Sequence, residues 1–256
     1  MVHRNNVLLF QELTHNAWPC RQHLLLNGWL LRISEGYTQR ANSVLPLYYH
    51  GTDPIADIRF TEVMYQKMQL SKIIFQIPEY VAPTTLDEVL ASLGYEKKSK
   101  TIVMTKTLDT QVVSKAIRDD LLYECDQNRV RWLNFKKTCS TGMNMYYPLL
   151  EKIIERIVIP TPRFFYVMAK EEIIGGLLGV IERGYFGLFA LEISPHYRRK
   201  QVALSLMQYV IEWCRTNQVH TIYLQAEEVN NPAIILYQKL GFISAYSYHY
   251  RIKELR

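Results

Sequence analysis

Apolar runs of strand length alternate with helical stripes in the second half of the chain. Segments 185–193 and 221–226 are mainly apolar and each predicts a buried strand. Between them, apolar residues recur at helical spacing and predict a helix over 200–216: Val202, Leu206, Val210 and Trp213 or Cys214. This order of elements is typical of an α/β fold.

A shorter helix and a last strand follow. The helix carries Ala233, Leu236, Tyr237 and Leu240 at positions i, i+3, i+4 and i+7. Asn231 suits its N-cap, Pro232 its first position and Gly241 the position that ends it. Segment 246–252 predicts the final strand.

The first half of the chain ends in the same way. Residues 72–77 predict a strand, and Thr85 with Glu88 predicts a capping box at a helix start. Gly94 ends this helix, and 101–107 predicts the next strand.

The two stretches align residue by residue. Leu90-x-x-Leu93-Gly94-Tyr95 corresponds to Tyr237-x-x-Leu240-Gly241-Phe242, and a longer helical pattern precedes each, at 55–70 and 200–216. The repeat predicts two related α/β domains, over residues 1–112 and 113–256. The polar stretch 109–120 contains the predicted boundary.

The two halves differ in their polar residues. Arg198-Arg199-Lys200 lies between a strand and a helix start, where free N–H groups and the helix dipole favour an anion. The corresponding segment 51–54 has no basic cluster, and Leu90 stands in the place of Tyr237. We therefore expect the second half to bind a phosphorylated ligand and carry the chemistry. The first half would serve as a scaffold, a lid or a partner surface.

Composition adds few constraints. The 256 residues are 48% hydrophobic, which supports a core in one large or two medium domains. The net charge of +6 favours acidic ligands but does not by itself predict nucleic-acid binding. The sequence shows no signal peptide and no apolar run of membrane-spanning length, which predicts a cytoplasmic protein.

Cysteines and histidines show no familiar ligand spacing. The four cysteines form no CxxC pair, which predicts reduced thiols rather than disulfides or zinc ligands. The seven histidines have no HxH or HExxH spacing, so no metal is expected. Gly175-Gly176-Leu177-Leu178-Gly179 is not a dinucleotide fingerprint and predicts a bulge or tight packing within a strand.

Three segments of the second half together resemble the GCN5-related N-acetyltransferase (GNAT) superfamily. They are Leu191 to Ala203, Asn230-Asn231-Pro232-Ala233, and Leu236 to Phe242. The family pattern N-x-x-A-x-x-L-Y-x-x-x-G-F is matched in full from Asn230 to Phe242. The pattern Gln/Arg-x-x-Gly-x-Gly/Ala is met at Arg198 and Ala203.

The resemblance implies an α/β (α+β) fold with two GNAT-like domains. Each would have a mixed, mostly antiparallel central sheet flanked by helices, with a splayed parallel strand pair in the C-terminal domain. The first half resembles the degenerate domain of tandem GNAT proteins. One residue departs from the pattern, because Gln201 stands where the family has glycine. Its side chain either bends away from the phosphate groove or narrows it.

The resemblance also implies acetyl-CoA, or another acyl-CoA, as donor. The implied binding residues are Leu191, Glu192, Ile193, Arg198, Arg199, Lys200, Gln201, Val202, Ala203, Asn230 and Tyr237. Asn230 would orient the pantetheine arm, and a backbone N–H near Ile193 would polarise the acyl carbonyl.

Two side chains are candidates for proton transfer. Tyr237 occupies the position of the family's general acid, and the alternative is an aromatic residue of the core. Glu192 alternates away from Leu191 and Ile193 along its strand. It would act as the base, directly or through water, or it is a solvated strand residue.

The leading hypothesis is an acyl-CoA-dependent N-acyltransferase that acetylates a primary amine of a small molecule or peptide by direct attack. The alternative is a non-catalytic GNAT-fold module that binds acyl-CoA or a protein partner. A nucleic-acid-binding protein is a third hypothesis that rests on mild basicity alone. Neither nucleic acid nor a membrane is an expected partner, and the sequence determines neither the acceptor nor the oligomeric state.

Overall fold

The chain divides into two compact units in the computed structural model, which describes residues 4–109, 118–139, 146–158 and 161–255. The first unit comprises residues 1–103, 227–229 and 245–256, and the second comprises 104–226 and 230–244. These units differ from the predicted ranges 1–112 and 113–256, because the last strand belongs mainly to the first unit. Residues 110–117 of the predicted boundary lie outside the described residues.

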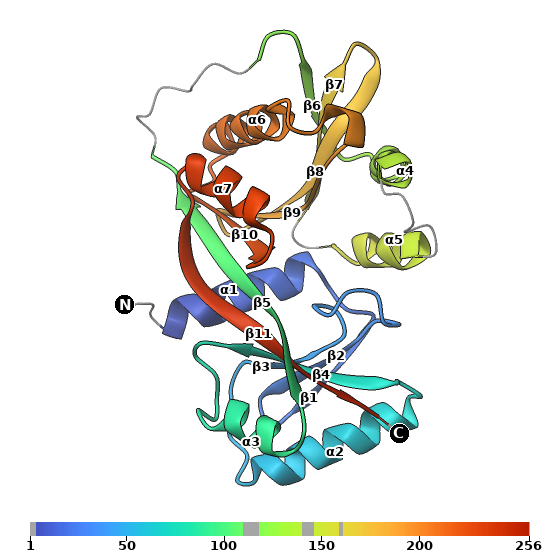
Figure 1. Cartoon of the computed structure of the whole chain (residues 1–256), viewed down its shortest axis with the longest axis vertical. Helices are drawn as coiled ribbons and strands as arrows, with labels where there is room; N and C mark the ends of the chain where they lie inside the picture. Colours follow the sequence, from blue (N-terminus) through green and yellow to red (C-terminus); the bar gives the residue numbers. More distant parts are fainter. Residues whose placement is uncertain (1–3, 110–117, 140–145, 159–160, 256) are drawn as a thin grey trace. The chain divides into compact units, whose positions relative to one another are not determined.

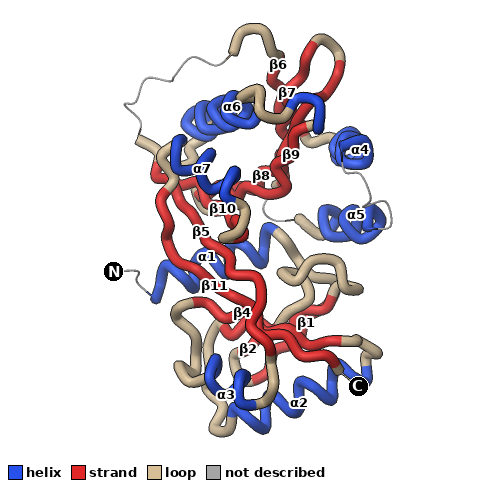
Figure 2. Tube along the Cα trace, in the orientation of Figure 1, coloured by secondary structure: helices blue, strands red, loops and turns tan. Residues whose placement is uncertain are grey.

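The first unit is a sheet with helices on both faces. Its elements are α1 (Arg4–Ala17), β1 (Gln22–Leu26), β2 (Trp29–Ile33), β3 (Val44–Pro46), α2 (Pro54–Lys67), β4 (Lys72–Pro78), α3 (Leu86–Ser92) and most of β5 (Glu96–Thr107) and β11 (Ile243–Glu254). Helices α2 and α3 cover one face of the strands and α1 the other (Figure 2). An apolar cluster that includes Trp29, Phe75 and Leu90 fills the space under α2 and α3.

The second unit holds the segments with the predicted chemistry. Its elements are β6 (Leu122–Asp126), α4 (Arg129–Cys139), α5 (Tyr147–Glu155), β7 (Pro162–Ala169), β8 (Glu172–Glu182), β9 (Tyr185–Ile193), a 3₁₀ turn (Pro195–Tyr197), α6 (Val202–Thr216), β10 (Thr221–Glu227) and α7 (Asn231–Lys239). Helices α4 and α6 lie on opposite sides of strands β7 to β9 (Figure 1).

The strands follow the order β1-β2-β3-β4-β11-β5-β10-β9-β8-β7-β6. Most of the described pairs are antiparallel, while β3 with β4 and β9 with β10 are parallel. This mixed α/β sheet confirms the predicted fold class. Within the described residues, no helix is both long and apolar enough to cross a membrane.

The predicted repeat is present in the structure. Gly94 and Gly241 both have a positive φ, of +81° and +82°, and each ends its helix. The N–H of the next residue then bonds back to the helix at 3.0 Å in both halves, from Tyr95 to the Leu90 carbonyl and from Phe242 to the Tyr237 carbonyl. This bond pattern is the Schellman motif, and it confirms the prediction that Gly94 and Gly241 end their helices.

Two predicted caps are wrong. The Thr85 side chain makes no cap hydrogen bond, because Thr85 itself has helical torsions. Asn230 rather than Asn231 caps α7, and its side-chain oxygen accepts from the Ala233 N–H at 3.3 Å. The Asn-Asn pair offers two candidates for a cap, and spacing alone did not distinguish them.

Charged contacts fix β11 within the first unit. It pairs antiparallel with β4, from Tyr248 with Pro78 to Glu254 with Lys72. Arg251 binds Asp87 of α3 through two hydrogen bonds, of 2.7 and 3.2 Å.

His249 donates from Nε2 to the same carboxylate at 2.8 Å. Partial burial raises the pKa of Asp87, but the hydrogen bonds and charges of Arg251 and His249 outweigh this effect and lower that pKa to about 2. Desolvation lowers the pKa of His249, so its imidazole is mostly neutral at pH 7.

We expect Asp87→Asn to lower the free energy of unfolding by about 1–2 kcal/mol at pH 7. Because the folded-state pKa of Asp87 is depressed, this stability is complete above the unfolded pKa of about 4 and is lost as pH falls toward 2. Urea unfolding at pH 7, 4 and 3 measures the difference. The exposed Glu88 of the same helix provides the control Glu88→Gln. A difference between wild type and Asp87→Asn that stays constant across this pH range would contradict the assignment.

Candidate functional site

The parallel pairing between β9 and β10 stops partway along both strands. Its register runs from Tyr185 with Thr221 to Leu188 with Leu224. Beyond that point β9 bulges against β8, with a register shift between Gly176 and Leu178 and a φ of +52° at Ala190. The end of β9 thus leaves its parallel partner, as the family resemblance implies.

A cleft of about 590 Å³ lies beside this end of β9. Its walls come from β9, the turn that follows, and the first turns of α6 and α7. Eight of the predicted site residues line it: Leu191, Ile193, Arg198, Arg199, Gln201, Val202, Ala203 and Asn230. Glu192, Lys200 and Tyr237, which were predicted with them, are not part of its lining.

The start of α6 presents backbone donors to the cleft. The Ser205 N–H bonds to the Gln201 carbonyl at 3.0 Å and makes the first helical hydrogen bond. The preceding N–H groups, from Val202 to Leu204, therefore have no acceptor within the helix. Since the helix dipole also places positive charge here, this end of the cleft suits an anion.

The turn before α6 adopts left-handed backbone torsions. Arg199 has a φ of +60° and Gln201, the N-cap residue, a φ of +61°. Gln201 therefore occupies a position that glycine adopts without strain, and its side chain makes no capping hydrogen bond.

The cations of this turn have different surroundings. Arg198 donates from Nε to the Ile193 carbonyl at 3.0 Å, so its side chain folds back along the cleft. The Lys200 ammonium lies 5.5 Å from the centre of the Tyr197 ring instead of in the cleft lining.

Sequence reasoning missed one residue that holds this turn. Arg118 donates from Nη1 to the Lys200 carbonyl at 2.8 Å, and its backbone N–H donates to the Ser205 hydroxyl at 3.3 Å. Asp120 forms an ion pair with the same guanidinium. Arg118 thus fixes the path of the turn while Asp120 balances its charge. No spacing rule connects Arg118 with Lys200, because they lie 82 residues apart.

Glu192 lies on the other side of the sheet from the cleft. Its carboxylate forms an ion pair with Lys136 of α4, and both side chains are largely buried, with 17% and 13% exposure. Tyr147 of α5 donates to the Lys136 carbonyl at 2.5 Å and holds the end of α4. The prediction that Glu192 points away from Leu191 and Ile193 is therefore confirmed. The alternative, that Glu192 is a solvated strand residue, does not fit a largely buried ion pair.

Tyr237 is a buried residue of α7 with 7% exposure. Its ring lies 5.8 Å from the ring of Phe242, measured between centres. Burial raises the pKa of Tyr237 to about 12, so the phenol keeps its proton at neutral pH. Its helical neighbours Ala233 and Leu236 line the cleft.

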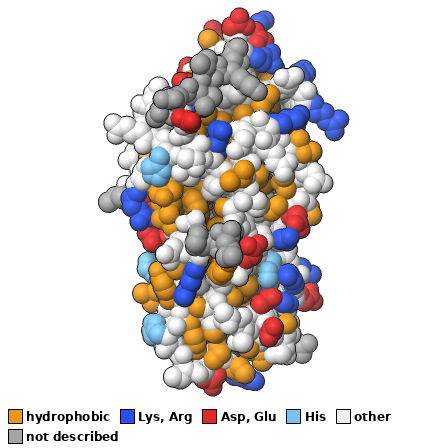
Figure 3. All heavy atoms as spheres, turned by 90° about the vertical axis from the view of Figure 1, so that its left-hand side faces the viewer, with side chains coloured by type: hydrophobic (Ala, Val, Ile, Leu, Met, Phe, Trp, Pro, Cys, Tyr) orange, Lys and Arg blue, Asp and Glu red, His pale blue; other side chains and the backbone are white. Residues whose placement is uncertain are grey.

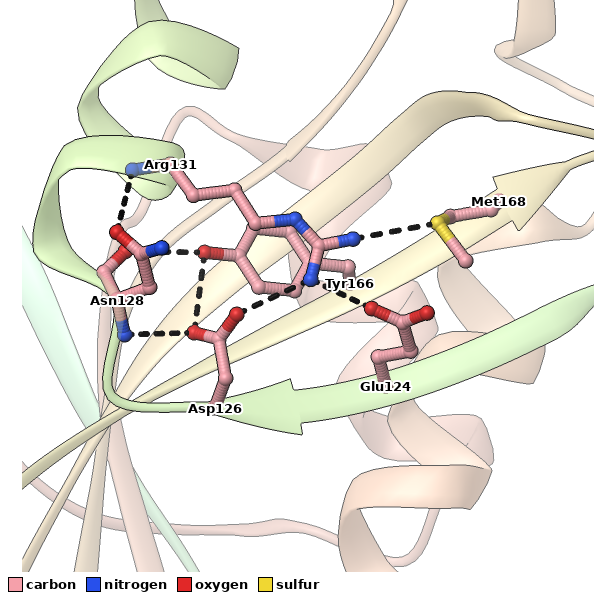
Figure 4. Close-up of polar contacts among 6 residues, drawn as sticks. All are labelled: Glu124, Asp126, Asn128, Arg131, Tyr166 and Met168. Carbon is pink, nitrogen blue, oxygen red and sulfur yellow. Dashed lines mark hydrogen bonds and ion pairs between the residues drawn. The ribbon is translucent and has the colours of Figure 1, made fainter.

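A second cavity, of about 660 Å³, opens on the α4 side. Arg131 at its wall is held by the carboxylates of Glu124 and Asp126, at 2.5 and 3.1 Å, and its guanidinium stacks 4.5 Å from the Tyr166 ring centre (Figure 4). Glu171 of the β7–β8 turn and Glu172, the first residue of β8, line the same cavity. The Arg131 charge is thus balanced locally.

Comparisons with known proteins point to one family. Residues 130–242 match the acetyltransferase (GNAT) family, and residues 10–150 match the family described as probable histone acetyltransferase Rv0428c C-terminal. A curated Bacillus subtilis protein, the uncharacterized N-acetyltransferase YobR, is 27% identical over 253 residues, which cover 98% of this chain and 100% of that protein.

Solved structures share the fold. A GCN5-related N-acetyltransferase from Kribbella flavida matches with a TM-score of 0.70 at 9% identity, over 99% of this chain and 96% of its own. A tandem GNAT protein from the clavulanic acid biosynthesis pathway matches with a TM-score of 0.63 at 10% identity, over 79% and 70% of the two chains.

We expect Gln201→Gly to be about 0.5–1 kcal/mol more stable than Gln201→Ala. Glycine relieves the left-handed strain, while its extra freedom in the unfolded chain offsets part of that gain. Urea unfolding of the two variants, at matched protein concentration, measures the difference. A glycine variant less stable than the alanine variant would show that residue 201 does not adopt this conformation in solution.

Proposed function

Because the chain belongs to the GNAT family of N-acetyltransferases, we propose that it transfers an acetyl group from acetyl-CoA, or another acyl-CoA, to a primary amine of a small molecule or peptide. The cleft between the end of β9, the start of α6 and the start of α7 is the observation that carries this proposal. The acceptor itself is proposed only as a class.

The residues of the cleft fit such a donor. One end combines free helical N–H groups with Arg198 and Arg199, a donor set that suits a diphosphate. Apolar side chains of β9 and α7, among them Leu191, Ile193 and Leu236, continue from that end and suit an extended arm. Asn230 also lines the cleft, and since its oxygen caps α7, its amide N–H₂ is the group that would donate to a ligand.

The bulge of β9 supports a backbone role for the end of this strand. The β9–β10 register stops at Leu188 with Leu224, so Leu191 and Ile193 lie beyond the paired part of the two strands. In the proposed reaction the Ile193 N–H donates a hydrogen bond to the acyl oxygen as negative charge develops there. When bound, acyl-CoA supplies the activated carbonyl and the sulfur leaving group.

Two side chains would move protons. Tyr237 holds a phenolic proton at neutral pH and would release it to the leaving sulfur. Glu192 would accept a proton from the amine, directly or through water, from the α4 side of the sheet. Lys136 orients the Glu192 carboxylate before the amine arrives. The carboxylates Glu171 and Glu172, at the cavity on that side, favour an approaching ammonium group.

One observation favours the non-catalytic alternative. Neither Tyr237 nor Glu192 lines the cleft, so a module that binds acyl-CoA without turnover is the second candidate. Acetyl-CoA at a hundredfold excess over its Kd should add about 2.7 kcal/mol to the unfolding free energy in either case. Release of free thiol with at least one member of a broad amine panel separates the enzyme from the module.

Nucleic-acid binding has little support on the face drawn in Figure 3, where Lys and Arg side chains are interspersed with Asp and Glu. Steeply salt-dependent binding to DNA or RNA would be the signature of that third hypothesis.

Arg199→Glu should weaken acetyl-CoA binding on the order of tenfold, because it places a negative charge beside the proposed diphosphate site. Isothermal titration at low and physiological salt measures the effect, which should shrink as salt increases. Lys152→Glu on α5 is the matched control, since it makes the same charge change outside the cleft. Equal affinity in wild type and Arg199→Glu would show that the basic turn is ordinary surface.

Tyr237→Phe should lower kcat on the order of 10²-fold while acetyl-CoA affinity stays the same. The change removes only the hydroxyl, so the packing against Phe242 is kept. Thiol release under saturating substrates measures kcat, and titration measures affinity. An unchanged kcat would contradict the general-acid role and leave Tyr237 as a structural residue of the core.

A further inference from the structure

A thiol and two imidazoles, all potential metal ligands, meet in the first unit. His15, Cys20 and His23 each offer one ligand atom, and these atoms all lie within 4.8 Å of one another. The two imidazole rings are arranged edge to face, with centres 6.0 Å apart. The spacing of this set, His-x₄-Cys-x₂-His, matches none of the HxH, HExxH and CxxC patterns.

The three residues lie close together because α1 is joined to β1 by a short loop. His15 lies in the last turn of α1, Cys20 in the loop that leaves the helix, and His23 near the start of β1. Cys20 is buried, with 6% exposure, while His23 is exposed. An ion would therefore reach the thiol from solvent past the His23 ring.

The surroundings of the His15 ring favour a role as a metal ligand. Its Nδ1 atom is buried and has no hydrogen-bond partner among the described residues. A ring nitrogen without a protein partner is a ligand atom that a cation can use.

Arg32 sets the charge balance beside this cluster. It stands directly opposite His23 in the β1–β2 register and is 1% exposed. Its guanidinium bonds to neutral acceptors, the Ser43 carbonyl and hydroxyl and the Gln76 amide oxygen, at 3.0, 2.6 and 2.8 Å. Within the described residues, none of its ion-pair or hydrogen-bond partners is a carboxylate. A thiolate at Cys20 would supply the missing negative charge.

We propose that His15, Cys20 and His23 form a binding site for a thiophilic d¹⁰ metal ion, Zn²⁺ or Cu⁺. Thiolate and imidazole are the ligands that both ions prefer. Ligand atoms around such an ion are roughly 3.5 Å apart, so the cluster closes by about 1 Å on binding. A bound Cu⁺ leaves the thiolate–metal unit neutral beside Arg32, whereas a bound Zn²⁺ leaves one positive charge. This difference makes the two ions separate arms of the test.

The test uses the full-length, reduced chain and measures binding of Zn²⁺, and of Cu⁺ under anaerobic conditions, by competition with a chromogenic chelator. Co²⁺ is the spectroscopic probe, because a thiolate ligand gives it a charge-transfer band. We expect one tightly bound ion per chain in at least one arm. His23→Ala and Cys20→Ser should each weaken binding at least about tenfold, and Cys20→Ser should abolish the Co²⁺ band.

Matched variants control for general thiol and imidazole binding. His50→Ala removes another exposed histidine of the first unit, and Cys125→Ser removes a thiol of the second unit. Both should keep wild-type affinity. His23 is exposed, so its variant should fold normally, and circular dichroism verifies this for Cys20→Ser as well. Undiminished binding in a folded His23→Ala chain, or no tight site in either arm, would overturn the proposal. This outcome is independent of the acetyl-CoA experiments.

Discussion

The interruption of parallel pairing between β9 and β10 is the constraint on which the proposed site depends. A continuous ladder would satisfy the backbone of both strands and leave no room beside them. The bulge at Ala190 adds one residue to β9, and the two strands stop pairing after Leu188 and Leu224. The cleft and the direction of Leu191 and Ile193 both follow from this local geometry.

The end of the cleft at the start of α6, which suits an anion, is formed by backbone in a strained conformation. Left-handed torsions at Arg199 and Gln201 turn the chain so that α6 begins with its free N–H groups toward the cleft. Arg118 ties the carbonyl in the middle of this turn to a distant segment, which keeps the turn in place. The left-handed backbone at residue 201 carries a side chain in a position suited to glycine, which costs stability.

The sequence predicted local structure best where a single residue type fixes the backbone conformation. Gly94 and Gly241 identified both helix ends, and the repeat around them identified two related units. Alternation along β9 correctly turned the Glu192 side chain away from Leu191 and Ile193. The resemblance nevertheless counted Glu192 among the donor-binding residues, and it does not line the cleft. The cap at Thr85 failed because a side-chain cap depends on the torsions of the cap residue itself, and Thr85 is helical.

The sequence by itself determined the α/β class, the repeat, and the basic turn between β9 and α6, since periodicity, glycine stops and neighbouring charges are local properties. Only the tertiary structure decided which distant side chains meet. It placed Lys136 against Glu192, Arg118 on the Lys200 carbonyl, and β11 in the first unit through Asp87. These contacts join residues 56 to 164 positions apart. Spacing along the chain leaves many such partners equivalent, and packing and charge pairing in the folded chain select among them.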